Sequence, residues 1–182
     1  MYEFNSASYN EFIRHYRKQS EKQLIVFAGD FDENRNYAVD QIRRETIGKI
    51  VEVDLNEIIT PFEEESFKNI DTAIDDIIDD AELVIFRNGG MLNGVYTGFT
   101  YSVVKYATPQ QKYFLNALNK LKCSALIEFN NTDQLDQMLK RVADVVVTFR
   151  APSSLIEKVV WWAKSIRVNG SILPSPRPRT DN

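Results

Sequence analysis

The sequence predicts an α/β protein built on a parallel sheet with helices on both faces. The first observation is an alternation: short apolar runs and segments of helical periodicity follow one another five times along the chain. This alternation is typical of right-handed βαβ crossovers, which produce parallel sheets. The second observation is that the apolar runs contain few polar side chains, as strands buried on both faces do. The chain has 182 residues, which is enough for one well-buried domain.

Five apolar runs are the predicted strands, and the segments around them are the predicted helices. The strands are expected at residues 24–28, 49–53, 83–86, 124–129 and 144–149. Helices are expected at residues 7–21, 35–46, 63–80 and 109–121, within 130–140, and from 152 onward. The expected parts of the chain are an N-terminal helix (1–21), the α/β domain (22–167) and a proline-rich basic tail (168–182).

Composition is that of an ordinary globular protein, with 43% apolar and 26% charged residues. The net charge of −4 disfavours a nucleic-acid binder, which usually has a basic surface. No apolar run approaches the ~20 residues that cross a bilayer, and the N-terminus has no signal-peptide pattern. The single cysteine, Cys123, forms no internal disulfide, which fits a cytoplasmic protein. The single histidine, His15, has no Cys or second His near it, so no metal site is expected.

The stretch of residues 24–45 has the layout of a phosphate-binding loop. An apolar run ends at Gly29, a polar turn follows, and an amphipathic pattern then begins. A helix after such a turn directs its first N–H groups at a phosphate, and the loop has the form G-x-x-x-x-G-K-S/T. In this chain Asn34, Arg35 and Asn36 stand where that form has glycine, lysine and a hydroxyl residue. The spacing of the phosphate-binding loop is kept, while the residues that would contact phosphate and magnesium are replaced.

Polar residues follow the predicted strands at the edge where ligands of such sheets bind, the carboxyl ends of the strands. These positions are residues 29–36, Asp54, Arg87 with Asn88, and Asn130 with Asn131.

The order of segments resembles the core of an AAA+ ATPase over about residues 22 to 165. The stretch VEVDLNEIITPFEEESFKNIDTAI is similar to the family's segment between its two nucleotide motifs. LVIFRNGGMLNG resembles its Walker B strand, and SALIEFNNTDQLDQMLKRVADVVVTFRAPSS resembles its sensor-1 strand, arginine-finger region and fifth strand. The resemblance implies a three-layer αβα sandwich with a five-stranded parallel sheet of the P-loop NTPase type, in strand order 5-1-4-3-2.

The departures from the family pattern imply that the site has lost its chemistry. Arg87 stands at the metal-holding aspartate and Asn88 at the catalytic glutamate, while Asn130 matches the sensor-1 asparagine. We expect no catalytic residue, no metal and no cofactor, with ATP or ADP and Mg²⁺ as the alternative. From the resemblance we also expect the family's helical lid to be absent after the last predicted helix. As a hypothesis, Arg87 pairs with the acidic loop residues Asp30, Asp32 or Glu33 and fills the emptied site.

Three residues match family positions that face other molecules. Phe62 matches the aromatic residue of the first pore loop, although a local packing role is the alternative. Lys140 and Arg141 match the arginine-finger region, where they serve a partner's site or simply solvate the end of a helix. The implied partner is an active AAA+ protein or a second copy of this chain.

The predicted function is therefore a catalytically inactive AAA+-like (pseudo-ATPase) domain that acts as a binding, scaffold or regulatory module. One alternative is a nucleotide binder with weak or no hydrolysis, and another is a clamp-loader-like accessory subunit. A third is an unrelated enzyme that uses the carboxylates of Asp30, Asp32 or Asp54, although no nucleophile, histidine base or metal cluster accompanies them.

Overall fold

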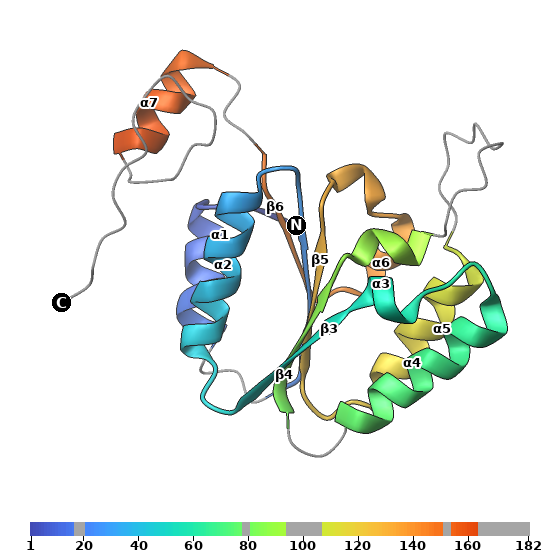
Figure 1. Ribbon diagram of the computed structural model, residues 1–182. Helices are drawn as coiled ribbons and strands as arrows, with labels where there is room; N and C mark the ends of the chain where they lie inside the picture. The colour runs from blue at the N-terminus through green and yellow to red at the C-terminus, as the bar shows by residue number, and fades with distance from the viewer. Residues whose placement is uncertain (17–20, 78–80, 94–106, 151–153, 164–182) are drawn as a thin grey trace, which may run out of the picture.

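The computed structural model describes residues 1–16, 21–77, 81–93, 107–150 and 154–163, with side chains as far as residue 160. Its centre is a six-stranded sheet in the order β1-β6-β2-β5-β4-β3, and each pair of neighbouring strands is parallel (Figure 1). The strands are β1 (Tyr2–Glu3), β2 (Leu24–Ala28), β3 (Lys49–Asp54), β4 (Ala81–Arg87), β5 (Ser124–Phe129) and β6 (Val145–Thr148).

The parallel sheet and the relative order of the five predicted strands agree with the sequence prediction, but the predicted number of strands is wrong. The additional strand is β1, which pairs with β6 through Tyr2 and Val147 and extends the sheet at that edge. The Phe4 N–H continues this contact by donating to the Thr148 carbonyl at 3.0 Å. A strand of two residues is too short to carry a period, so its position depends on the neighbouring strand rather than on its own sequence.

Helices cover both faces of the sheet. Figure 1 shows α1 (Ala7–Tyr16) and α2 (Asp32–Glu45) over one face, and α4 (Glu63–Ile77) and α5 (Pro109–Ala117) over the other. The remaining helices are α3 (Leu55–Ile58), α6 (Gln137–Val142) and α7 (Leu155–Ala163), with 3₁₀ turns η1 (Gly89–Asn93), η2 (Leu118–Lys120) and η3 (Thr132–Gln134). None of the helices in the described ranges has the length and apolar character that crossing a bilayer requires.

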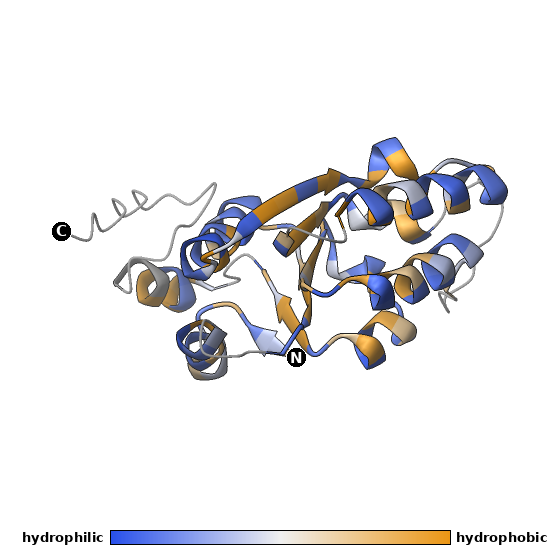
Figure 2. Cartoon of the chain, turned by 90° about the horizontal axis from the view of Figure 1, so that it is seen from below, coloured by the Kyte–Doolittle hydropathy of each residue, from blue (hydrophilic) through white to orange (hydrophobic). Residues whose placement is uncertain are grey.

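The hydrophobic core forms two layers because successive strand residues point to opposite faces. On β2, Ile25 and Phe27 pack beneath α1 and α2, while Val26 and Ala28 belong to the layer beneath α4 and α5. Figure 2 shows apolar residues along most of the strands and polar residues over the outer sides of the helices. A fully buried Phe, such as Phe27, contributes about 1.5–3 kcal/mol relative to exposure, so both layers contribute to the free energy of folding.

The connection from β2 to α2 differs from the prediction. We expect the helix from Arg35, but it begins at Asp32, so only residues 29–31 connect strand and helix. Asp32 and Glu33 occupy the first turn, where negative charge interacts favourably with the helix dipole. The predicted phosphate-loop frame is therefore wrong in its geometry, because most of its residues are already helical.

Gly29 is required at this connection by the close approach of another segment. Its φ is +151°, and a Cβ atom there would lie 1.8 Å from the backbone oxygen of Phe149. Its N–H donates to the Phe129 carbonyl at 3.2 Å, which ties the turn to the end of β5. The glycine thus serves the packing of three chain segments against one another.

Candidate functional site

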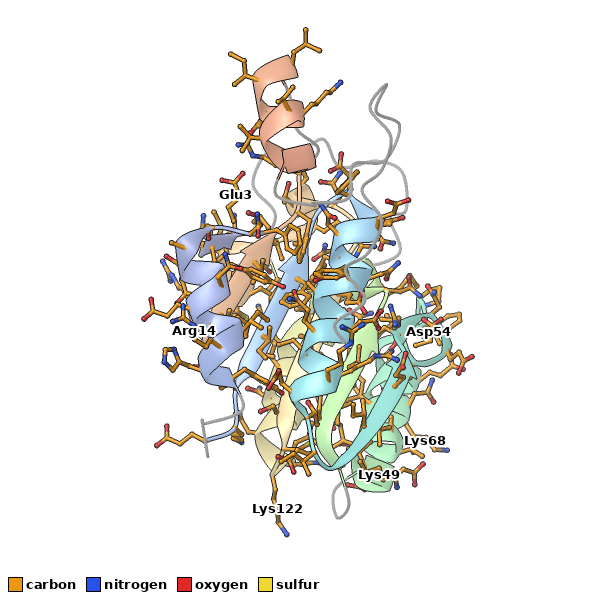
Figure 3. The ribbon with its side chains drawn as sticks, turned by 90° about the vertical axis from the view of Figure 1, so that its left-hand side faces the viewer. Glu3, Arg14, Lys49, Asp54, Lys68 and Lys122 are labelled. Carbon is orange, nitrogen blue, oxygen red and sulfur yellow. The ribbon has the colours of Figure 1, made fainter. Side chains whose placement is uncertain are left out.

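The carboxyl edge of the sheet brings together residues from four strands. The register pairs Asp54 of β3 with Arg87 of β4, and Ala28 of β2 with Phe129 of β5. Figure 3 marks the direction of β3 by its two labelled ends, with Lys49 at the amino edge and Asp54 at the carboxyl edge. The sequence-predicted residues Gly29, Arg35, Arg87, Asn88 and Asn130 lie at this carboxyl edge or in the loops and helix that follow it.

The side chain of Arg35 closes the turn that the sequence assigns to phosphate. It is 6% exposed and lies on the buried face of α2. Its Nη1 donates to the Gly29 carbonyl, and its Nη2 donates to Asp32 Oδ1 at 2.7 Å and to Asn130 Oδ1 at 3.0 Å. The guanidinium therefore occupies the space between the turn, the first turn of α2 and the end of β5.

Glu128 is the buried carboxylate that balances this charge, and sequence reasoning missed it. Its side chain is 4% exposed; Oε2 lies 3.4 Å from Arg35 Nε and Oε1 lies 2.8 Å from Arg87 Nη1. Burial raises the pKa of Glu128, and the positive charges of Arg87 and Arg35 offset part of that effect. The glutamate joins α2 to β4 across β5.

Glu52 and Arg43 extend the contacts toward the edge of the sheet. Arg87 Nε lies 3.1 Å from Glu52 Oε2, and Glu52 Oε1 accepts from Arg43 Nη2 on the C-terminal half of α2. We call the following six residues the arginine–carboxylate network: Asp32, Arg35, Arg43, Glu52, Arg87 and Glu128. Its three arginines and three carboxylates alternate, so the network is electrically neutral and attaches α2 to the sheet near both of the helix ends.

The network tests the pairing hypothesis for Arg87. Arg87 does form ion pairs, but its partners are Glu52 and Glu128 rather than Asp30, Asp32 or Glu33. The hypothesis is wrong about the partners because Arg87, Glu52 and Glu128 point to the same face of neighbouring strands. The signal in the sequence was a single acid within an otherwise apolar run: Glu128 in SALIEF and Glu52 in KIVEV.

Asn88 and Asp54 form a second contact at the same edge. Asn88 has φ of +60°, in the left-handed region, and its Nδ2 donates to Asp54 Oδ1 at 2.8 Å. The same oxygen accepts from the Asn56 N–H at 2.9 Å and caps α3. The hydrogen bond from Asn88 is the main reason that the pKa of Asp54 is lowered, followed by the bond from Asn56. This carboxylate has a structural use, and it is not a free acid or base.

The other sequence-predicted positions lie outside the network. Asn34 is buried on α2, and Asn36, one helical position beyond Arg35, is exposed. Phe62 is 70% exposed directly before α4. Lys140 and Arg141 are exposed on α6, which ends just before β6 and therefore near the amino edge of the sheet. The structure does not bring Lys140 and Arg141 to the carboxyl edge.

Among the described residues, the site offers charge pairing and hydrogen bonding. In the described ranges no group of three or more His, Cys, Asp and Glu side chains is placed to hold a metal ion. The network carboxylates each contact an arginine, and Asp54 contacts an amide and a backbone N–H. A nucleophile with an adjacent base, which covalent catalysis needs, is not found among these residues.

Comparisons with known proteins support a fold and not a family. No protein-family model and no curated protein matches the chain. A chain of the E. coli MS115-1 HORMA:CdnC:Trip13 complex is similar in structure, with a TM-score of 0.51 and 17% sequence identity. The alignment covers 94% of this chain and 64% of that chain, so this chain spans less than two thirds of its structural relative. In total 328 chains of solved structures are similar, so the fold alone does not single out an activity.

These findings correct the assignment to the AAA+ ATPases. The AAA+ membership, the P-loop NTPase type and the interpretation as a degenerate Walker A pseudoenzyme have no support from a family model or a curated relative. Similarity at 17% identity to a chain of a HORMA complex shows the fold alone. The supported description is an α/β protein with a six-stranded parallel sheet whose carboxyl edge contains the arginine–carboxylate network.

Proposed function

We propose that this protein is a non-catalytic protein-binding module of the regulatory or adaptor kind. The observation that carries the proposal is the position of Arg35. Its buried guanidinium contacts Gly29, Asp32, Asn130 and Glu128 at the edge where open α/β sheets usually bind their ligands. Because the protein's own side chains fill this site, we infer that the protein binds its partner through another surface.

The exposed apolar side chains of α7 support such a role. Leu155, Ile156 and Val159 are 75%, 79% and 51% exposed, and Val160 is 42% exposed. Figure 1 shows α7 after β6, beyond the helices that cover the sheet. A helix of nine residues gains most of its stability from packing of an apolar face, and this face is open to a partner. Apolar surface of this kind is typical of interaction sites.

The comparison with the HORMA:CdnC:Trip13 complex is consistent with this proposal. The similar chain belongs to an assembly of several proteins. The argument from it is one of analogy, because a shared fold does not imply a shared partner. The partner of this chain is therefore to be identified by experiment.

The first prediction is that nucleotides do not bind. Thermal denaturation with ATP or ADP and Mg²⁺ is expected to give the same melting temperature as the protein alone, because Arg35 already fills the turn. A nucleotide present at about 100 times its Kd would stabilise the protein by about 2.7 kcal/mol, which is readily measured. A clear upward shift with ATP and Mg²⁺ would contradict the closed-site argument.

The second prediction concerns binding through α7. The tagged protein, expressed at its natural level and cross-linked in its own cells, is expected to capture one or more proteins identified by mass spectrometry. Val159→Asp places a charge on the exposed face of α7 and should reduce that capture at least fivefold, the effect of ~1 kcal/mol.

Ile47→Asp is the matched control, because Ile47 is 78% exposed between α2 and β3. This variant should capture the same proteins as the unmodified chain. If the unmodified chain, Val159→Asp and Ile47→Asp all capture the same proteins in equal amount, α7 is not the interaction site. If the unmodified chain captures no protein, the proposed function is wrong.

A further inference from the structure

One outer edge of the sheet, that of β3, is open to another chain. β3 is the last strand in the sheet order and pairs only with β4. In the described ranges no other strand lies along its outer side, and Figure 1 shows β3 in front of β4 with no helix across it. Alternate N–H and C=O groups of an edge strand point away from the sheet, where they can pair with a further strand.

The two edges of the sheet differ in what they offer to a further strand. At the opposite edge, β1 has only two residues, and short edge strands resist such pairing. β3 has six residues and contains neither proline nor glycine. Its ladder with β4 is irregular only between Lys49 and Ile50, at the start of the strand. Most of β3 is therefore a regular edge that is long enough to pair.

The apolar side chains of β3 are less covered than those of the interior strands. Val51 and Val53 are half-buried on the side of the sheet that α4 covers, and Ile50 is half-buried on the side of α2. On the neighbouring strand β4, the four residues 83–86 are all buried. A strand added beside β3 would remove the remaining apolar surface of these side chains from water, which is favourable.

A second copy of this chain is the partner that fits the edge. It has the same open strand, so a single contact pairs the backbone groups of both copies. Most soluble oligomers are symmetric, with two-fold dimers the commonest. Two copies of β3 related by a two-fold axis run antiparallel, and the axis stands perpendicular to the sheet. Each residue then faces one on the same side of the sheet, so the two residue numbers have an even sum.

The charges of β3 select one register among those that symmetry allows. With the axis at Val51, five residues of each strand pair and Ile50 faces Glu52 of the second copy, so no like charges are opposed. With the axis at Glu52, the two Glu52 side chains face each other. With the axis at Val53, Glu52 faces Asp54, and like charges directly opposite each other are destabilising. An axis at Ile50 leaves only three paired residues in each strand.

We propose that two copies of the chain pair through β3, antiparallel and centred on Val51, so that their sheets form one continuous sheet. The backbone hydrogen bonds provide affinity, while the side chains fix the register. Val51 contacts its counterpart on the side of the sheet that α4 covers. This contact goes beyond the proposed binding through α7, which follows β6 at the other end of the strand order.

Sedimentation equilibrium of the full chain at a series of concentrations tests the pairing. The average mass should rise with concentration from 21.0 kDa toward twice that value. A mass that stays at the monomer value throughout would overturn the proposal. Val159→Asp, which changes the exposed face of α7, should associate as the unmodified chain does. Loss of association in this variant would assign the contact to α7 and contradict the assignment to β3.

Cysteine cross-linking tests the register, in a chain that carries Cys123→Ser so that the introduced thiol is the single one. Val51→Cys places the two introduced thiols opposite each other, with about 4.5–5.5 Å between Cα atoms, which a disulfide can bridge. Val53→Cys is the matched control, because Val53 is half-buried on the same side of the sheet. In the proposed register its two copies are offset by about 13 Å along the strands, too far for a disulfide.

Glutathione disulfide is the oxidant: the two introduced thiols form one disulfide, and two molecules of reduced glutathione leave. Electrophoresis without reductant should show about tenfold more covalent dimer with Val51→Cys than with Val53→Cys. Equal yields from the two variants, or more dimer from Val53→Cys, would overturn the proposed register. Neither the mass nor the cross-link depends on capture through α7, so this proposal can fail while the proposed function stands.

Discussion

Glu128 is the residue on which the carboxyl edge of the sheet depends. Two arginines from different elements contact its buried carboxylate, Arg35 from α2 and Arg87 from β4. Glu128 and Arg35 are buried, whereas Arg87 is 34% exposed. Taking charged groups out of water is costly, and their attraction repays that cost only when each buried charge keeps its partner. Replacing both partners of a buried ion pair with apolar residues often leaves the stability unchanged. Removing only one partner leaves an uncompensated buried charge, which destabilises the protein.

The third prediction follows from this asymmetry. Glu128→Gln preserves shape and removes the charge, so Arg35 loses its buried counter-ion and Arg87 loses one of two. The free energy of unfolding should fall by about 3 kcal/mol, the usual cost of breaking a buried pair. Urea denaturation measures it. A loss below 1 kcal/mol would show that solvent reaches the network in solution.

Glu52→Gln is the matched control for that variant. Glu52 contacts two arginines as Glu128 does, but its side chain is 43% exposed. Exposed ion pairs contribute about 0–1 kcal/mol, so this variant should lose much less stability than Glu128→Gln. Equal losses from both variants would mean that burial does not set the strength of these contacts.

At the scale of elements, α4 and α5 are joined by a polar contact above the apolar layer. Tyr113 of α5 donates from its hydroxyl to Asp71 Oδ2 at 2.5 Å, and the Lys120 amine lies 2.9 Å from Asp71 Oδ1. The Tyr113 ring also stacks on Phe67 of α4, with 4.2 Å between ring centroids. The hydrogen bond from Tyr113 is the main reason that the pKa of Asp71 lies below its ordinary value of 3.8, followed by the bond from Lys120.

The fourth prediction is the pH dependence of this contact. Because the folded pKa of Asp71 is lowered, the unfolded chain binds its proton more tightly and the carboxylate stabilises the fold above pH 3.8. That contribution is lost as pH falls through the lowered folded value. Asp71→Asn should therefore lower the melting temperature at pH 7, and the difference from the unmodified protein should shrink in strong acid.

Thermal denaturation followed by circular dichroism at a series of pH values measures both effects. Asp76→Asn on the same helix is the control, because Asp76 is exposed. The size of the Asp71 effect is small, as for any largely exposed ion pair. A difference that stays constant from neutral to strongly acid pH would contradict the titration of Asp71.

At the scale of the whole molecule, the N-terminal segment belongs to the same packed unit as the sheet. β1 pairs with β6, and Tyr9, Phe12 and Tyr16 of α1 are buried against the layer that contains Phe27 and other strand residues. Tyr9 also donates from its hydroxyl to Gln41 of α2 at 2.6 Å. These contacts connect the two helices that cover this face of the sheet.

The fifth prediction is the result of deleting residues 1–16. The deletion removes the strand that covers the edge of β6 and exposes the apolar residues beneath α1, so the melting temperature should fall clearly. An uncovered strand edge also favours association between chains, which light scattering during heating would detect. An unchanged melting temperature would mean that this segment is an appendage. Arg14→Gln, which leaves the buried face of α1 intact, should melt as the unmodified protein does.

The sequence by itself determined the elements that carry a strong local pattern. Uniform apolar runs predicted the central strands, and the alternation of strands with helices predicted a parallel sheet with helices on both sides, as observed. These inferences succeed because the patterns arise from burial on two faces and from the direction of crossover connections. The signal for α2 was weaker: polar residues fill its first turn, and its start was placed at Arg35 rather than Asp32.

Only the tertiary structure decided how the charged residues pair and which edge of the sheet is open. Glu128 and Arg87 are 41 positions apart and meet because β4 and β5 are neighbours in register. The direction of Arg35, into the turn and away from solvent, likewise depends on the ends of β2 and β5. Ion pairs and pockets form between side chains that are distant in sequence, and the local periodicity of the sequence does not predict such contacts.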